Sequence, residues 1–158
     1  MITPELLHCA ESSVSCWLAT VSESGEPNVS PKEAFHIEKD GRILLANIAS
    51  PQTVRNIRIH SKVCLSFVNV FIQKGFKVHG EASILESSDP GYDEAHGKLT
   101  RLFGDTFTIV SIISIQATRV SPIVAPSYKV RPESTERDRI RESIQSYRVE
   151  EFLERVRD

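Results

Sequence analysis

A short polar segment that follows an apolar run holds the residues best suited to binding an anion. The run at 41–45, GRILL, predicts a buried strand, and the chain after it turns small and polar before it becomes helical. Ser50 and Pro51 are typical of the N-cap and first positions of a helix. The backbone N–H groups of Gln52 and Thr53 are then free at the positive end of the helix dipole. This helix start predicts an anion site, to which the Thr53 hydroxyl can add a donor.

Two basic residues can supply the opposing charge at this site. Arg55 lies three residues after Gln52, on the same face of the expected helix. Ser30, Pro31 and Lys32 interrupt an extended run two elements earlier in a predicted meander, so Lys32 can approach the same anion. The alternative is an ordinary capped helix with solvated arginines, beside a surface lysine on an edge strand.

The elements that must position these residues are mostly extended runs. They are CWLATVS, NVSPKEAFHIE, RILLAN, KVCLSFVNVFI, FKVHGEASILE and TFTIVSIISIQATRV. Asp40-Gly41 predicts a type I′ hairpin turn, and Gln73-Lys74-Gly75 predicts a second turn. Helices are expected at about 51–60 and from Ser88 to near Gly104. The predicted fold class is mainly β, a barrel of about six antiparallel strands with inserted helices.

Two of these strands carry large apolar residues whose covering has to be explained. In the last run, Ile113 and Ile115 lie on one face and Ile112 on the other. One face can line the core, and the other is covered either by a partner chain or by the protein's own helices. Trp17 lies inside the first run and is expected in the core.

Composition and charge exclude several classes of function. The chain has 158 residues, enough for one domain with its own core, and its net charge of −2 disfavours nucleic acid as a partner. No apolar run is long enough to span a membrane, and the N-terminus does not have the pattern of a signal peptide. The three cysteines are typical of reduced thiols, which favours a cytoplasmic protein. The spacing of histidines and cysteines predicts no metal site.

The composition changes near residue 127. Pro122, Pro126 and Pro132 precede or begin the charged segment ESTERDRIRESIQSYRVEEFLERVRD. Its mixed charges and thin apolar stripe predict a solvated helix that docks by one edge. The stripe consists of Ile140, Ile144, Tyr147, Phe152 and Val156. We therefore expect a barrel domain over 1–127 and a charged helical extension over 128–158.

As an ordered whole, the chain from about residue 14 to 125 resembles the flavin-binding split barrels related to pyridoxamine 5′-phosphate oxidase. The resemblance rests on WLATVSESGEPNVSPKEAFHIEKDGRILLANIASPQTVRNIRIHSKVCLSFV, on VHGEASIL and on the last strand. It implies a split barrel that forms a homodimer with FMN at the subunit interface. It implies that segment 30–32 and loop 50–53 hold the phosphate and ribityl chain. It also implies that the isoalloxazine ring is faced by the backbone of Ala46, Asn47, Ile48 and Ala49.

The sequence departs from this family's pattern in two places. Many relatives carry a lysine just before the threonine of the phosphate loop, where this chain has Gln52, so Lys32, Arg55 or another cation must meet the phosphate charge. True pyridoxamine phosphate oxidases also carry a C-terminal substrate signature with Trp, Arg and His. Here Leu153 follows Phe152 and no such motif follows. The chain is therefore not expected to have that oxidase activity.

A flavin carries hydride chemistry itself, which agrees with the lack of a recognisable catalytic constellation in the sequence. The leading hypothesis is an FMN-dependent oxidoreductase that acts on a small substrate or an electron partner. The alternatives are a non-catalytic flavin-binding or redox-sensing module, and a split barrel that binds deazaflavin or haem. Apolar contact with the flavin ring must supply much of the affinity. Phe107 can provide that contact, and Trp17 is the alternative stacking partner.

Overall fold

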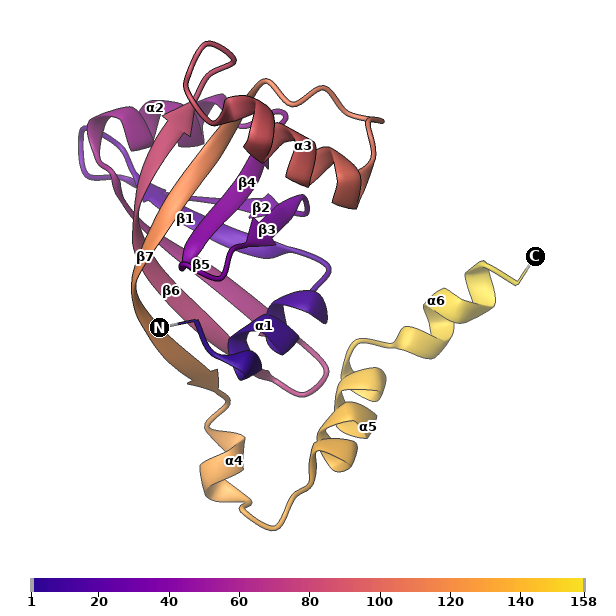
Figure 1. The fold of residues 1–158 in the computed structure, drawn as a ribbon. Coiled ribbons are helices and arrows are strands. Elements are labelled where there is room, and N and C mark those ends of the chain that lie inside the picture. Colours follow the sequence, from indigo (N-terminus) through magenta and orange to yellow (C-terminus); the bar gives the residue numbers. More distant parts are fainter. Residues whose placement is uncertain (1, 158) are drawn as a thin grey trace.

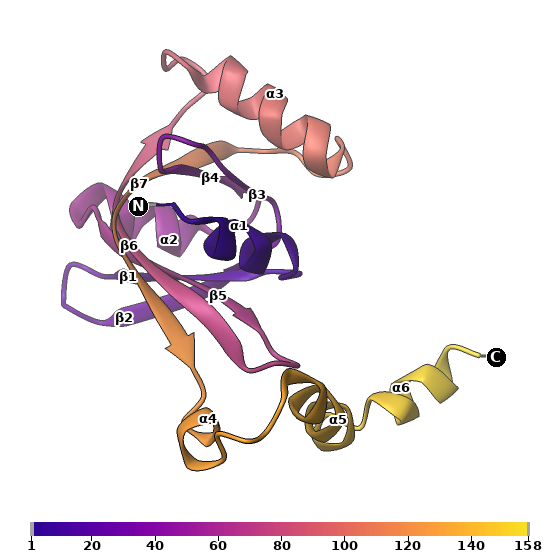
Figure 2. The ribbon, with the colours of Figure 1, turned by 60° about the horizontal axis from the view of Figure 1, so that its bottom comes forward.

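The computed structural model describes residues 2–157, and its centre is one antiparallel sheet that curls on itself (Figures 1 and 2). The strands are β1 (Cys16–Val21), β2 (Pro27–Lys32), β3 (Phe35–Ile37), β4 (Arg42–Asn47), β5 (Lys62–Asn69), β6 (Lys74–Leu85) and β7 (Ser111–Val124). Their order is β2-β1-β5-β6-β7-β4-β3, so β2 and β3 are the two edges. A curled antiparallel sheet with unpaired edges is a split barrel, and the predicted fold class is confirmed.

The sheet has seven strands, one more than predicted, because the second predicted run is broken. Pairing with β1 ends at Lys32, and pairing with β4 begins at Phe35. The break therefore follows Lys32 instead of falling at Ser30 and Pro31, and Pro31 pairs with Trp17 inside β2. Proline is tolerated there because β2 is an edge strand. One short segment thus joins the two edges of the sheet.

The turn at Asp40-Gly41 is not of the predicted type. Gly41 has a φ of 93° and donates its N–H to the Glu38 carbonyl at 3.1 Å. A type I′ turn needs positive φ at both central residues, and Asp40 does not have it. The hairpin is therefore closed by a type I turn followed by a glycine bulge, which still joins β3 to β4.

The turn predicted at 73–75 lies earlier in the chain. Gln73 has a φ of 57°, and β6 already begins at Lys74. Gly75 lies inside the strand, where an added Cβ would stand 2.0 Å from the Phe67 carbonyl oxygen. Glycine is needed there because the neighbouring backbone approaches closely, and not because of a turn.

Three helices pack on the barrel: α1 (Pro4–Glu11), α2 (Pro51–Ile59) and α3 (Tyr92–Phe103). Leu6 of α1 and Ile57 of α2 join the main apolar core inside the curl. α3 lies over β4 and β7, where Leu99 and Ile112 belong to a second apolar cluster (Figure 1). At Ile112 the second apolar face of the last strand is therefore covered by the chain's own helix, which was one of the two expected coverings.

Trp17 is not in the core, and that prediction was wrong. Side chains of a strand alternate between its faces, and in β1 Cys16 and Leu18 take the inward positions. Trp17 points outward and is 48% exposed. Val21 on the same strand and Val29 on β2 are also exposed. We call Trp17, Val21 and Val29 the outer apolar patch.

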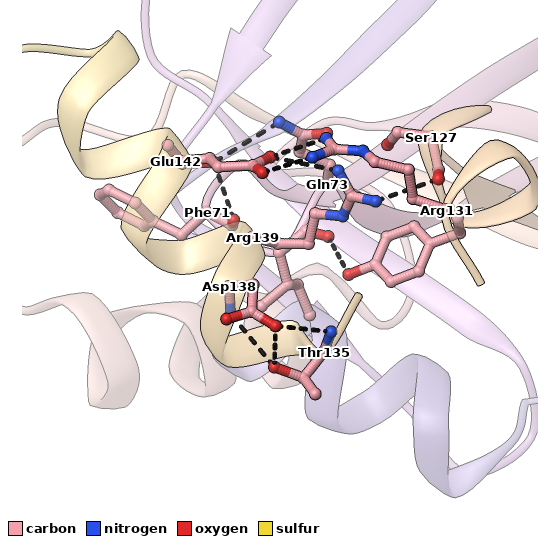
Figure 3. A network of polar contacts seen from close by, with 11 residues as sticks. Phe71, Gln73, Ser127, Arg131, Thr135, Asp138, Arg139 and Glu142 are labelled. Carbon is pink, nitrogen blue, oxygen red and sulfur yellow. Dashed lines mark hydrogen bonds and ion pairs between the residues drawn. The ribbon is translucent and has the colours of Figure 1, made fainter. Parts of the chain in front are cut away.

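Three further helices follow β7 and extend away from the barrel (Figures 1 and 2): α4 (Ser127–Val130), α5 (Glu136–Ser146) and α6 (Val149–Arg155). α5 docks on the turn between β5 and β6, where Ser143 Oγ donates to the Phe71 carbonyl at 2.9 Å. The buried Arg139 donates to the Ser127 carbonyl at 3.0 Å (Figure 3). The docking edge combines these polar contacts with an edge-on contact of 6.3 Å between the ring centroids of Phe71 and Tyr147. Tyr147 belongs to the predicted apolar stripe, whereas Phe152 of that stripe is exposed. None of the helices within 2–157 is both long and apolar enough to span a membrane.

Candidate functional site

A cavity of about 540 Å³ opens where β2, β4 and the start of α2 meet. Its lining consists of Ser30, Pro31, Lys32, Glu33, Ala34, Ala46, Ile48, Ala49, Ser50, Phe103 and Phe107. Seven of these belong to the predicted site, and they come from segments that are distant in the sheet order. Only the β3 half of the second predicted run pairs with β4, whereas β2 pairs with β1. The segment that joins the two sheet edges brings Lys32 to the cavity.

Two charged residues line this cavity, the buried Lys32 and the exposed Glu33, and they form no ion pair with each other. Lys32 is only 5% exposed, and its ammonium group donates a hydrogen bond to Ser50 Oγ. Burial lowers the pKa of Lys32 below the usual lysine range, and the nearby Cys16 thiol opposes this shift only in part. Within residues 2–157 no carboxylate forms an ion pair with it. A buried cation without a counter-charge is costly, so the cavity suits an anionic ligand.

Thr53 does not line the cavity but contacts Ser30, which does. Thr53 is buried, and its hydroxyl oxygen lies 3.0 Å from Ser30 Oγ, with which it forms a hydrogen bond. Asn28 donates to the same hydroxyl at 3.5 Å and to Thr20 at 3.2 Å. These bonds connect α2 to β2 and β1. Thr53 therefore positions Ser30, which does face the cavity.

Ser50 is the N-cap residue of α2 and Pro51 its first residue, as predicted, but the Ser50 side chain makes no capping hydrogen bond. The Ser50 hydroxyl is instead the partner of Lys32. The Ser50 N–H donates to Asn47 Oδ1 at 3.2 Å, and the Asn47 amide donates to Ser111 at 2.9 Å. The buried Asn47 thus fixes the turn from β4 into α2, and this turn places Ile48 and Ala49 at the wall of the cavity.

Gln52 and Arg55 lie apart from the Lys32 cavity. They line a separate, open cavity of about 470 Å³ that also touches Glu23. Arg55 donates to Gln52 Oε1 at 2.6 Å, and Gln52 donates to Asn56 Oδ1 at 2.7 Å. Both ends of the Gln52 amide are therefore occupied by neighbours on its own helix. Of the two predicted cations, the structure places only Lys32 in the cavity that holds most of the predicted site.

Phe103 and Phe107 contribute large apolar side chains to the lining of the Lys32 cavity. Phe103 is the last residue of α3, and sequence reasoning did not include it in the site. Phe107 was placed on the last strand, but it lies on the loop before β7 and is 64% exposed. The glycine after Phe103 indicates where α3 ends. No sequence signal indicates that this end lies beside β4.

A family comparison covers the same part of the chain. The model for pyridoxamine 5′-phosphate oxidase matches residues 2–123, from the N-terminus to the penultimate residue of β7. The chain belongs to the pyridoxamine 5′-phosphate oxidase family. The match includes both sheet edges and the whole Lys32 cavity, and it ends before α4. A search of curated proteins found no match.

Solved structures resemble this family member in fold. HupZ of Group A Streptococcus is 24% identical over 79% of this chain and 99% of that chain, with a TM-score of 0.67. An FMN-binding protein of Syntrophomonas wolfei is 19% identical over 77% and 88%, with a TM-score of 0.64. The haem storage protein HutZ of Vibrio cholerae is 18% identical over 77% and 92%, with a TM-score of 0.63. These similarities show a shared fold among proteins whose descriptions name different ligands.

Proposed function

We propose that the protein binds FMN in the Lys32 cavity and is an FMN-dependent oxidoreductase. One observation carries the proposal: Lys32 is buried at the cavity with a hydroxyl, and no carboxylate within residues 2–157, as its partner. A phosphate would supply the missing negative charge. The Ser30 and Ser50 hydroxyls lie at the same cavity and can donate to phosphate or ribityl oxygens.

The flavin ring is assigned to the apolar part of the cavity. Ala46, Ile48 and Ala49 form one wall, and Phe103 and Phe107 contribute the other. Hydrogen bonds to a charged group contribute about 1.5–3 kcal/mol each. Micromolar affinity requires about 8 kcal/mol, in addition to the entropic cost of association. The phosphate contacts therefore orient the ligand, and burial of the ring at about 25 cal/mol per Å² supplies much of the remainder.

The chain's own residues have a supporting role in this chemistry. A bound flavin supplies hydride transfer, so no nucleophile from the protein is needed. Lys32 holds the anionic end, and the Asn47 turn fixes the wall at Ile48. The two phenylalanines limit the access of water to the ring. Gln52 and Arg55 act outside this site, where Arg55 adds only a screened surface charge.

A homodimer is part of the proposal. The Lys32 cavity is open, and the outer apolar patch includes Trp17, which pairs in register with Pro31 of the cavity rim. Exposed apolar patches mark interaction sites, and a second copy of the chain is the partner we assign to this one. We further propose a cytoplasmic location, and a division into a flavin-binding barrel over 1–127 and a helical extension over 128–158.

The absorbance spectrum of the purified protein, taken before and after FMN loading and desalting, tests the proposal. Retained flavin bands are expected, and they should be lost on Lys32→Met. A colourless protein after loading would contradict it, and a haem or deazaflavin spectrum would assign the cavity to that ligand instead. Oxidation of NAD(P)H by the loaded protein would separate an oxidoreductase from a non-catalytic flavin module. Sedimentation of wild type and Trp17→Glu tests the dimer.

A further inference from the structure

A second cavity, of about 390 Å³, adjoins the Lys32 cavity. Glu33 and Phe103 line both, so the two cavities share a wall. The volume lies within the range of about 300–1,000 Å³ that small-molecule sites occupy. The second cavity lies between α1, β3 and the end of α3, and its position beside the proposed flavin site suits the molecule that reacts there.

Most of the second cavity's wall is apolar and partly aromatic. Leu7 comes from α1, Phe35 from β3, and Leu102 with Phe103 from α3. The rings of Phe35 and Phe103 lie 6.4 Å apart between centroids. Phe35 is held in turn by an edge-on contact with Phe67 of the core, at 5.3 Å. Such a wall favours a ligand with a flat or branched hydrocarbon body.

The charged groups of the second cavity are acidic. Its titratable lining residues are Glu11, Glu33 and His36, and no lysine or arginine lines it. Within residues 2–157 neither Glu11 nor Glu33 forms an ion pair. Two unpaired carboxylates beside an apolar wall attract an organic cation and repel an organic anion. The neighbouring Lys32 cavity shares the exposed Glu33 but also holds the buried Lys32, which favours an anion there.

We propose that the second cavity binds the substrate of the flavin site, and that this substrate is an organic cation: an ammonium group on an aromatic or branched hydrocarbon body. The ammonium lies at Glu11 and Glu33, and the body lies against Phe35 and Phe103. The assignment of this ligand as a substrate rests on the proposed FMN function, because it places the ligand beside the ring. The recognition itself depends only on residues of the second cavity.

The test uses matched probes on the full chain, both FMN-free and FMN-loaded. The probes are 2-phenylethylammonium, neutral 2-phenylethanol and anionic 3-phenylpropionate, and binding is followed by ligand-observed NMR. We expect the cation to bind at least about tenfold more tightly than the anion. Its addition should also change the fluorescence of bound FMN, because Phe103 lines both cavities.

Two variants and their controls locate the binding site. Val14 is 88% exposed and lines only the second cavity, so Val14→Trp should block the cation and leave FMN retention unchanged. Val130→Trp, at an exposed position on α4, is its control. Glu11→Gln should weaken cation binding about threefold, as expected for one exposed charge, whereas Glu133→Gln should not.

Equal binding of cation and anion, or cation binding that Val14→Trp leaves unchanged, would overturn the proposal. FMN retention in the same samples reports separately on the proposed function. If FMN fails to bind while the cation binds with both variant effects, the flavin assignment is wrong and the recognition of a cation by the second cavity stands. If FMN binds and the cation does not, the flavin site stands and the substrate class is wrong.

Discussion

The two flanks of α2 differ in how they present a positive charge. On one flank Lys32 is buried at a cavity and bonded only to the Ser50 hydroxyl within the described residues. On the other flank Arg55 is exposed and donates to Gln52. Both cations lie near the same helix start, so the dipole of α2 does not distinguish them. Burial and the lack of a counter-charge at Lys32 distinguish the two cations.

This difference indicates which flank can hold an anion tightly. An exposed cation is screened by water and salt, and a pair that it forms contributes about 0–1 kcal/mol. A desolvated cation interacts more strongly, because the effective dielectric constant around it is lower. Part of the free energy needed to desolvate the Lys32 ammonium group is already spent when the protein folds, before any ligand binds. A phosphate should therefore gain most from Lys32 and least from Arg55.

Removing the charge of Lys32 should have the largest effect. Lys32→Met keeps most of the side chain's length and should weaken FMN binding about ten- to a hundredfold, because a contact to a charged group contributes about 1.5–3 kcal/mol. Fluorescence titration of FMN measures this. The same variant should raise the melting temperature of the FMN-free protein, because it removes a buried unpaired charge. A lower melting temperature with unchanged FMN affinity would contradict the assignment.

Raising the pH should have the next largest effect, and it acts on the same flank. Since burial lowers the pKa of Lys32, its charge and the FMN affinity are fully present below that pKa and are lost as pH rises through it. The free energy of unfolding of the FMN-free protein should change in the opposite direction. It should rise with pH between the lowered pKa of Lys32 and the usual lysine pKa of about 10.4, because the unfolded chain binds the proton more tightly over that range. Lys32→Arg keeps its charge over this range, so its FMN affinity should fall less. Identical pH profiles for both proteins would exclude Lys32 as the titrating group.

Thr53 offers an intermediate effect through Ser30. Thr53→Val removes the 3.0 Å bond to Ser30 Oγ and should weaken FMN binding about three- to tenfold, as expected for one hydrogen bond. Thr53→Ser keeps the hydroxyl and is the matched control. Titrations of the two variants that give equal affinities would show that the hydroxyl does not position Ser30.

The exposed flank should give the smallest effect. Arg55→Met removes a charge from α2 outside the Lys32 cavity, so FMN affinity should change less than about twofold. Titration at low and at moderate salt checks this, because a screened surface charge matters less as salt rises. A loss of FMN affinity as large as that of Lys32→Met would contradict the assignment of the phosphate to the Lys32 flank.

The sequence predicts the fold well where patterns are local. Alternating apolar runs and turn residues predict the strands, and Ser50-Pro51 predicts the start of α2. Segment 30–32 and residues 46–50 were predicted as one site from the order of the meander and from the family resemblance, and seven of these eight residues line one cavity. The type of turn at Gly41 was missed because a glycine bulge and a type I′ turn favour the same residues.

The errors concern directions that only the folded chain determines. Helical spacing shows that Gln52 and Arg55 share a face, but it does not show which way that face points. Trp17 was placed in the core because the first run is apolar, whereas its position in the alternation makes it point outward. Phe103 was missed because the packing of α3 on β4 is a long-range contact. Local patterns specify these residues' elements but not their neighbours.

The most direct test of the central claim is the ratio of FMN dissociation constants between Lys32→Met and Arg55→Met, measured in one buffer at neutral pH. Both variants remove one positive charge and leave an unbranched apolar side chain. We expect Lys32→Met to bind FMN at least about tenfold more weakly than Arg55→Met, because of the two residues only Lys32 is buried at the cavity. A ratio near one, or weaker binding by Arg55→Met, would contradict it.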